Sequence, residues 1–316
     1  MPIFQHVRTS RYFPAWLVIS AIWFVIFGLT FLFIARYSEA EVSGAPSSSL
    51  SSSGLFTTPS IPSQLSFCGE PVPLDQPFVR QQLEAELISN VYNVPATLLI
   101  LKRAPMWRDT MVHILEKAGI PSDFFYLMLA ESGARNVRSP AGAQGFWQFM
   151  PQTAKEYGLR VDEYVDFRND PIRSTGAAAR YLLKAFERFG NWTITAASYN
   201  MGMAGVSKSM GYQKQSNYHN LYLNAETLRY VYRILAYKCI IENPAAYGYM
   251  LTSDDYYKLP PTNAVAVEGP VNWVDIALSY GTSFKVLRFL NPWIDSSSLN
   301  TTGGQTYWVQ VPRNTN

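Results

Sequence analysis

Residues 124–154 read FFYLMLAESGARNVRSPAGAQGFWQFMPQTA, an apolar run followed by a loop rich in small residues. The apolar run predicts a buried helix that ends close to Glu131, and Glu131 shares one helical face with Phe124, Leu127 and Met128. Burial raises the pKa of a carboxyl group, and the negative end of a helix dipole raises it further. A carboxyl that stays protonated near neutral pH suits a general acid. From this local pattern alone, a paired or surface glutamate is the stronger interpretation.

The sequence on both sides of this stretch keeps helical spacing. Strand patterns are scarce before residue 264, so residues 71–260 are predicted to form one all-α domain. A glycine-rich run at 200–205 follows one of these helices. The predicted helices are 78–90, 96–118, 124–130, 151–157, 172–189, 192–199 and 227–242.

The pattern changes after Leu259-Pro260-Pro261, so residues 261–316 are predicted to form a small separate module. Its order is β-α-α-β. The predicted elements are a strand at 264–267, helices at 274–279 and 284–290, and a strand at 307–311.

The N-terminal part predicts an exported protein. Residues 15–35, AWLVISAIWFVIFGLTFLFIA, are uncharged and long enough to cross a bilayer. Arg8 and Arg11 precede them, so the positive-inside rule places residues 1–37 as a cytoplasmic tip and transmembrane anchor, with the rest in the periplasm. A signal sequence cleaved near Ala40 is the alternative, which would leave the chain free in the periplasm. Residues 38–70, rich in serine and proline, are predicted to be a flexible linker.

Composition excludes several classes of protein. The formal net charge is +3 over 316 residues, without the clustered basic face of a nucleic-acid-binding protein. The two cysteines, Cys68 and Cys239, belong to no Cys/His cluster, which argues against a zinc site. In an exported chain they form either one disulfide or two free thiols. Aromatic residues make up 15%, which suits either core packing or carbohydrate binding.

Three motifs in order carry a resemblance to a known family. Glu131-Ser132 followed by residues 139–154 resembles the ES…SPAGA-x-G-x-x-Q-x-M-P-x-TA pattern of lytic transglycosylases of the goose-type lysozyme superfamily. Residues 197–202, ASYNMG, are similar to the A-x-Y-N-x-G motif of that family, and Glu226-Thr227 with Tyr230 resembles its third motif. The resemblance is nearest to the membrane-bound murein transglycosylases of the D type. It implies a lysozyme-like fold, although the loop after Ser132 is slightly shorter than in many relatives and the D type is often lipid-anchored.

The resemblance also implies roles for individual residues. Glu131 matches the catalytic acid/base. Ser139 matches a hydroxyl that contacts the substrate or tunes the acid, and Glu226 matches a buried carboxylate that supports the site. For Met150 and Tyr230, core packing is the competing interpretation. The full set of residues implied to bind substrate is Ser139, Gln148, Met150, Tyr199, Asn200, Glu226 and Tyr230.

The activity implied is cleavage of the β-1,4 bond between N-acetylmuramic acid and N-acetylglucosamine in peptidoglycan. In the family mechanism one glutamate protonates the glycosidic oxygen and then activates the 6-hydroxyl of the muramic residue, giving a 1,6-anhydro end without water, metal or cofactor. No Asp or Glu lies between Glu131 and Glu156, which favours this mechanism over one with two carboxylates. A hydrolytic lysozyme-like muramidase stays open if Asp162, Asp166 or Asp170 approaches in the fold. An inactive peptidoglycan-binding scaffold and a component that cuts the wall for a morphogenesis or secretion partner are the other hypotheses.

The C-terminal module resembles a LysM repeat. The resemblance lies in residues 272–277, 280–283, 287, 290–292 and 309–312. It implies binding of glycans that contain N-acetylglucosamine, which would raise the local concentration of substrate. A packing appendage on the catalytic domain is the alternative. The expected partners are therefore peptidoglycan strands and, through residues 15–35, a membrane. The sequence predicts no nucleic-acid partner and names no protein partner.

Overall fold

The computed structural model describes residues 57–300 and 304–313. The predicted anchor at residues 15–35, its alternative as a signal sequence and most of the predicted linker lie outside the described residues. Within the described residues, no helix combines the length and apolar character needed to cross a membrane.

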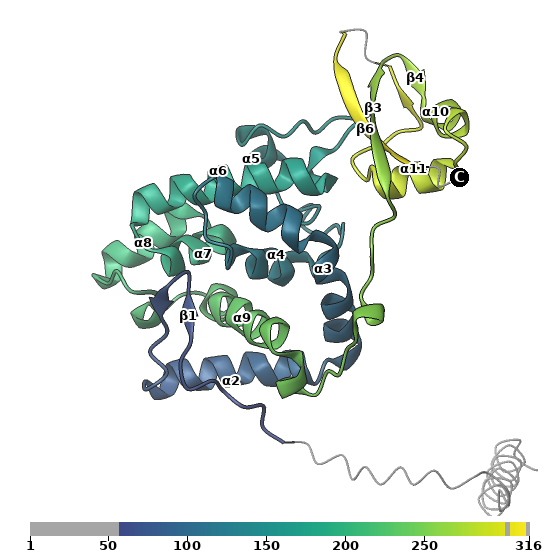
Figure 1. Ribbon diagram of the computed structural model, residues 1–316. Helices are drawn as coiled ribbons and strands as arrows, with labels where there is room; N and C mark the ends of the chain where they lie inside the picture. The colour runs from purple at the N-terminus through teal and green to yellow at the C-terminus, as the bar shows by residue number, and fades with distance from the viewer. Residues whose placement is uncertain (1–56, 301–303, 314–316) are drawn as a thin grey trace, which may run out of the picture. The chain divides into compact units, whose positions relative to one another are not determined.

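Helices make up most of the larger domain (Figure 1). The prediction of a mainly helical fold is confirmed for this part of the chain. The α-helices of this domain are α2 (Pro77–Val91), α3 (Val94–Lys117), α4 (Phe124–Ser132), α5 (Pro151–Glu156), α6 (Pro171–Phe189), α7 (Trp192–Met201), α8 (Met203–Gln213) and α9 (Ala225–Glu242). The described part of this domain also has four short 3₁₀ turns, at Phe167–Asn169, Tyr218–Asn220, Pro244–Tyr247 and Ser253–Asp255.

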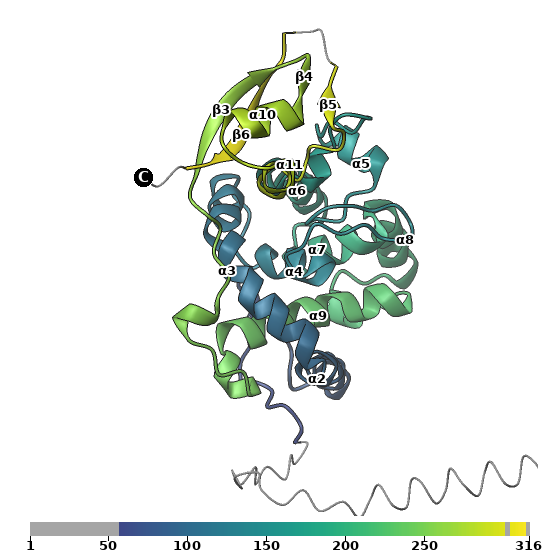
Figure 2. The same ribbon diagram turned by 90° about the vertical axis from the view of Figure 1, so that its right-hand side faces the viewer.

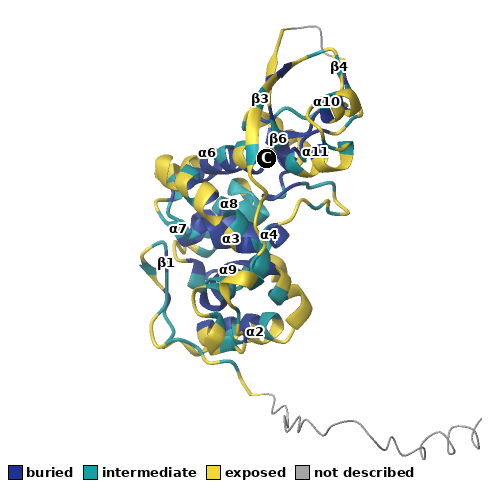
Figure 3. Cartoon of the chain, turned by 45° about the vertical axis from the view of Figure 1, so that its right-hand side comes forward, coloured by how far each residue is buried: buried dark blue, intermediate teal, exposed yellow. Residues whose placement is uncertain are grey.

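Helix α4 forms the centre of this domain. All six residues from Phe124 to Leu129 are buried, and Figure 3 shows α4 in dark blue among more exposed elements. A helix that is apolar all round can be stable in water only when other elements cover it on every side. Helices α3 and α9 pack on α4, while α6 packs on α3 and α7. The core therefore holds the C-terminal end of α4, where Glu131 lies, in a fixed place.

Two elements of the larger domain differ from the sequence prediction. A hairpin of β1 (Ser66–Phe67) and β2 (Glu70–Pro71) crosses the predicted end of the linker, and Phe67 is fully buried in the core. The folded part therefore begins before residue 71. Helix α8 follows directly on α7, although the glycine-rich run at 200–205 gave no helical prediction.

The C-terminal module has the predicted β-α-α-β order with one short strand pair added. Strands β3 (Thr262–Glu268) and β6 (Thr306–Pro312) form an antiparallel ribbon (Figure 2). In this ribbon Val265 pairs with Val309. Helices α10 (Trp273–Ser279) and α11 (Phe284–Leu290) lie between them in sequence. The added pair is β4 (Val271–Asn272) and β5 (Ser298–Leu299).

The module packs directly against the larger domain, and the described residues from 57 onward form one compact unit. Val165 and Ile294 form an isolated β-bridge. Two main-chain hydrogen bonds flank it, from Asp166 N to the carbonyl of Trp293 at 2.9 Å and from Asp295 N to the carbonyl of Tyr164 at 3.0 Å. The loop that precedes α6 is therefore shared between the two domains.

Both cysteines are free thiols in this structure, so the disulfide alternative is not realised here. Burial raises the pKa of both thiols, that of Cys239 to about 11, which keeps them protonated at neutral pH.

Candidate active site

Glu131 lies in the last turn of helix α4, and the end of this helix sets its position. The helix stops because Gly133 takes the left-handed conformation, with φ +60°, and its N–H donates to the carbonyl of Leu129 at 2.8 Å. A Cβ at Gly133 would lie only 3.0 Å from the side chain of Ile100. Glycine therefore satisfies both the turn and the close approach of α3, and Glu131 lies in the last turn of the helix.

The carboxyl group of Glu131 is half-buried and titrates near neutral pH. Burial raises its pKa to about 7, and the negative charge of Glu226 acts in the same direction. A hydrogen bond donated by the hydroxyl of Tyr230 and the positive charge of Arg233 act against this rise. Near pH 7 both protonation states of Glu131 are populated, which is the condition for one group to serve as acid and then as base.

Tyr230 packs in the core, as one of the two interpretations had it, and it also contacts Glu131. Its ring is buried in the core on helix α9, and its hydroxyl donates to the carboxyl of Glu131. Burial and the negative charge of Glu131 raise the pKa of Tyr230 well above 10, so it remains a neutral donor over the working pH range.

Tyr199 on helix α7 holds the loop that follows α4. Its hydroxyl donates to the carbonyl of Trp147 at 2.8 Å, and its ring packs edge-on against Trp147 and Phe149. Burial, followed by the charge of Glu131, raises the pKa of Tyr199 well above 10. Tyr199 therefore lies near Glu131 as a neutral group bound to the loop.

Asn200 and Glu226 form a small polar network at the start of α9. Asn200 donates from Nδ2 to Glu226 Oε1 at 3.0 Å, and Thr227 donates from its hydroxyl to Asn200 Oδ1 at 2.6 Å. The expectation that Glu226 is buried is wrong, because its side chain is exposed. It lies in the first turn of α9, after the cap residue Asn224, where a carboxylate is favoured by the helix dipole while still in contact with water.

The side chains of the loop 139–150 mainly hold the loop itself. Gln148 has φ +49° and donates from Nε2 to the carbonyls of Val137 at 2.9 Å and Gly145 at 2.8 Å. The hydroxyl of Ser139 accepts a hydrogen bond from Ala143 N at 3.0 Å. The structure therefore gives both residues a loop-closing role.

Met150 is the outer residue of this loop. Its side chain is 43% exposed, so the alternative that it packs in the core is wrong. It precedes helix α5, where Pro151 takes the first helical position.

A buried ion pair that the sequence analysis missed supports the same loop. Arg168 binds the carboxylate of Asp166 through two nitrogens, with the shortest distance 2.6 Å. Its Nη1 also donates to the carbonyls of Gly142 at 3.0 Å and Phe149 at 3.2 Å. Because both ends of the loop 139–150 are held by one guanidinium group, its shape depends on the Asp166–Arg168 pair.

Gly145 explains why the loop can approach this pair so closely. Its φ is +86°, and a Cβ there would lie 1.8 Å from the carbonyl oxygen of Arg168. Only glycine fits at this position without a backbone shift.

The three aspartates that kept a hydrolytic mechanism open are engaged elsewhere. Each of them forms a salt bridge with an arginine: Asp162 with Arg160, Asp166 with Arg168, and Asp170 with Arg173. Glu226 is the carboxylate whose charge acts on Glu131. Among the residues that the structure describes, no group of three or more His, Cys, Asp or Glu side chains could hold a metal ion.

The comparisons with known proteins place two domains on the chain. Residues 114–222 match the transglycosylase SLT domain, and residues 263–315 match the soluble lytic transglycosylase C-terminal LysM-like domain. The chain therefore carries an SLT domain followed by a LysM-like domain.

Among individual proteins, the chain is similar to the membrane-bound lytic murein transglycosylase D of Escherichia coli K12. The two are 30% identical over 242 residues, which cover 74% of this chain and 52% of that protein. A putative tributyltin chloride resistance protein of an Alteromonas species is 26% identical over 197 residues, covering 60% of this chain and 95% of the relative. A solved structure of an inactive mutant of the lytic transglycosylase Slt from Pseudomonas aeruginosa aligns with 24% identity and a TM-score of 0.36, over 44% of this chain and 24% of that one. The chain thus spans about half the length of the murein transglycosylase it matches.

Proposed function

We propose that this chain is a peptidoglycan lytic transglycosylase that cleaves the β-1,4 bond between N-acetylmuramic acid and N-acetylglucosamine and leaves 1,6-anhydro-muramyl ends. The observation that carries the proposal is the carboxyl of Glu131, held at the end of α4 with a pKa of about 7 inside an SLT domain. A relative that is 30% identical over 242 residues is described as a membrane-bound lytic murein transglycosylase.

Glu131 performs both proton transfers in this mechanism. In its protonated form it gives a proton to the glycosidic oxygen as the bond to the anomeric carbon breaks. The carboxylate then takes the proton of the 6-hydroxyl of the same muramic residue, whose oxygen attacks the anomeric carbon. A hydrogen bond from Tyr230 stabilises the carboxylate between the two steps. Because the nucleophile belongs to the substrate, correct positioning supplies much of the rate.

The loop 139–150 and the pair Tyr199 and Asn200 form the surroundings of Glu131 in this proposal. Met150 is exposed beside the loop and is available to contact a glycan strand, whereas Ser139 and Gln148 keep the loop in shape. Asn200 joins Glu226 to the body of the domain, so the charge that helps to raise the pKa of Glu131 is fixed in place.

Peptidoglycan is the substrate and the expected partner. The LysM-like module supports this choice, since it matches the C-terminal domain of soluble lytic transglycosylases. We place the enzyme in the cell envelope, with residues 15–35 as the membrane anchor and the catalytic domain in the periplasm; release by cleavage of the N-terminal segment is the alternative. The membrane-bound description of the relative from Escherichia coli agrees with an envelope location.

A hydrolytic muramidase is the second candidate, and the exposed carboxylate of Glu226 is the observation that favours it. A hydrolase needs a second carboxylate to activate water. Glu226 lies close enough to raise the pKa of Glu131, but it also accepts a hydrogen bond from Asn200. This bond and the absence of any Asp or Glu between Glu131 and Glu156 favour the anhydro product.

The test is a digestion of purified peptidoglycan followed by mass spectrometry of the products. We expect anhydro-muropeptides from the parent chain and from Glu226→Gln, and none from Glu131→Gln. Reducing-end products that disappear in Glu226→Gln would instead establish the hydrolase. Absence of any product from the folded parent chain would favour a binding scaffold.

A further inference from the structure

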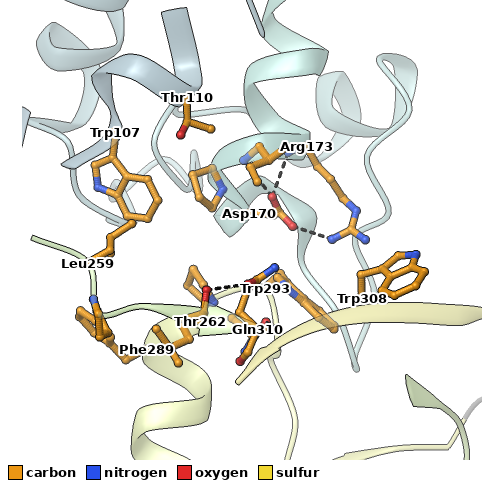
Figure 4. A pocket seen from close by; sticks show the side chains of 16 residues that line it. Trp107, Thr110, Asp170, Arg173, Leu259, Thr262, Phe289, Trp293, Trp308 and Gln310 are labelled. Atoms are coloured by element: carbon orange, nitrogen blue, oxygen red, sulfur yellow. Dashed lines mark hydrogen bonds and ion pairs between the residues drawn. The ribbon is translucent and has the colours of Figure 1, made fainter. Parts of the chain in front are cut away.

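A pocket lies between the two domains, apart from the residues around Glu131. Its volume is about 440 Å³, within the range of about 300–1,000 Å³ that is usual for ligand sites. Figure 4 shows its two walls. Trp107, Asp170 and Arg173 come from the catalytic domain, and Phe289 and Trp308 come from the module. Glu131 and its hydrogen-bond partner Tyr230 do not line it.

The module wall carries two exposed aromatic rings that the fold does not require. The alternation along β6 buries Tyr307, Val309 and Val311 and turns Trp308 outward, where it is 58% exposed. The residue opposite Trp308 in the ribbon is Ala266, too small to cover an indole. Phe289 on α11 is 63% exposed. Large apolar side chains gathered at a pocket mark a binding site more often than a structural need.

The catalytic wall adds a third ring that reaches toward the active-site loop. Trp107 on α3 is half-buried and packs edge-on against Phe146, with ring centroids 5.1 Å apart. Phe146 belongs to the loop 139–150. Within the described residues no hydrogen bond engages the indole N–H of Trp107 or of Trp308, so both donors are available to a ligand.

The charged side chains that line the pocket, Asp170 and Arg173, are paired with each other. Arg173 is the cation of the lining, and it binds Asp170 at 2.5 Å while its guanidinium lies over the ring of Phe167 at 4.2 Å. An anionic ligand therefore finds no unpaired positive charge here. The remaining polar groups are neutral, chiefly Thr262 and Gln310, which bind each other at 2.8 Å.

We propose that this pocket binds a neutral N-acetylated sugar unit, N-acetylglucosamine in preference to the acid-bearing muramic residue, and that one bound glycan contacts both domains. The inference deepens the proposed function and rests on it for the identity of the polymer. A sugar ring has an apolar C–H face that packs on Trp308 or Phe289, and a rim of neutral hydroxyl and acetamido groups that bind indole N–H, threonine and glutamine side chains.

The test is a titration of the full chain with the β-1,4-linked trimer of N-acetylglucosamine, followed through the indole N–H resonance of Trp107. This trimer lacks the muramic residue that the proposed reaction consumes, so binding is measured without turnover. The resonance is assigned as the signal missing from Trp107→Phe. Because the probe lies on the catalytic wall, substitutions on the module wall affect it only if one ligand contacts both.

We expect a saturable shift of the Trp107 resonance. The affinity for the trimer, measured from this shift, should be about tenfold weaker in Trp308→Ala and in Phe289→Ala. Tyr280→Ala is the matched control, since Tyr280 is an exposed aromatic residue of the module outside the pocket, and it should leave the affinity unchanged. Thermal melting confirms that each variant is folded.

Three results would overturn the proposal: no shift of Trp107, a shift with equal affinity in the parent and both module variants, or a response to a free stem tetrapeptide in place of the trimer. A digestion that yields no anhydro ends while the titration behaves as expected would refute the proposed reaction and leave the sugar pocket intact.

Discussion

Replacing Tyr230 by phenylalanine should move the pH dependence of the enzyme toward alkaline values. The hydroxyl of Tyr230 donates to the carboxyl of Glu131, and this bond lowers the pKa of Glu131 because it favours the ionised form. Without it, burial and the charge of Glu226 act against Arg233 alone, so the pKa of Glu131 rises above its present value of about 7. In the proposed mechanism the first proton transfer needs protonated Glu131, so kcat/KM should fall as pH rises through this pKa.

The size of the shift follows from the energy of the bond. A hydrogen bond to a charged group is worth about 1.5–3 kcal/mol, and one pKa unit corresponds to about 1.4 kcal/mol. Water reaches the half-buried Glu131 and replaces part of the lost bond, so we expect the lower end, a shift of roughly one pH unit. The assay is the initial rate of anhydro-product release from solubilised glycan strands between pH 5 and pH 9. Tyr230 itself stays neutral throughout, because burial raises its pKa well above 10.

Tyr199→Phe is the control for this prediction. It removes a hydroxyl that binds the carbonyl of Trp147 rather than Glu131. We expect a lower kcat in this variant with the alkaline limb unmoved. An unmoved limb in Tyr230→Phe, or equal shifts in both variants, would refute the assignment of Glu131 as the titrating acid.

Three further predictions concern stability and charge. Burial raises the pKa of Glu131 in the folded state above its unfolded value, so ionisation of Glu131 lowers stability as pH rises. Glu131→Gln should therefore increase the free energy of unfolding by about 2–3 kcal/mol above pH 7 and leave it unchanged near pH 4. Urea titrations at both pH values measure this. Arg168→Met leaves the carboxylate of Asp166 buried without its partner and should cost about 3–5 kcal/mol, whereas the double variant with Asp166→Asn should recover part of this loss in the same measurement. Glu226→Gln removes a negative charge that raises the pKa of Glu131, so its alkaline limb should move to lower pH, opposite to Tyr230→Phe, and a shift in the same direction would contradict the charge effect.

Periodic patterns predicted most helices because their apolar residues face a common core. The predicted helix at 284–290 has the observed bounds, and the helix predicted at 172–189 begins one residue early, at Pro171. Helix α8 was not predicted because Gly202, Gly205 and Gly211 lower the helical propensity of this segment. It forms nevertheless because it packs on α7, where Gly205 lies against the side chain of Met201.

The sequence predicted which residues belong to the candidate site but not how they contact one another. Motif spacing pointed to Glu131 and Tyr230, which the fold joins by a hydrogen bond. Gln148 closes its own loop with a backbone of positive φ, and no sequence pattern predicts that conformation for a glutamine. The pairing of Asp166 with Arg168 was missed because an Asp-x-Arg sequence is common on surfaces, and only the tertiary fold buries it.

The β-bridge between Val165 and Ile294 holds the module to the larger domain independently of the chain segment that links them. Main-chain bonds from Asp166 and Asp295 already fix the module to the loop before α6, so the covalent link at residues 256–261 is not the sole restraint. A single proteolytic cut after Lys258 should then yield two fragments that still migrate as one particle in gel filtration. The catalytic domain and the module would behave as halves of a split protein, and reassembly from separately made pieces becomes a route to exchanging modules between enzymes of this kind.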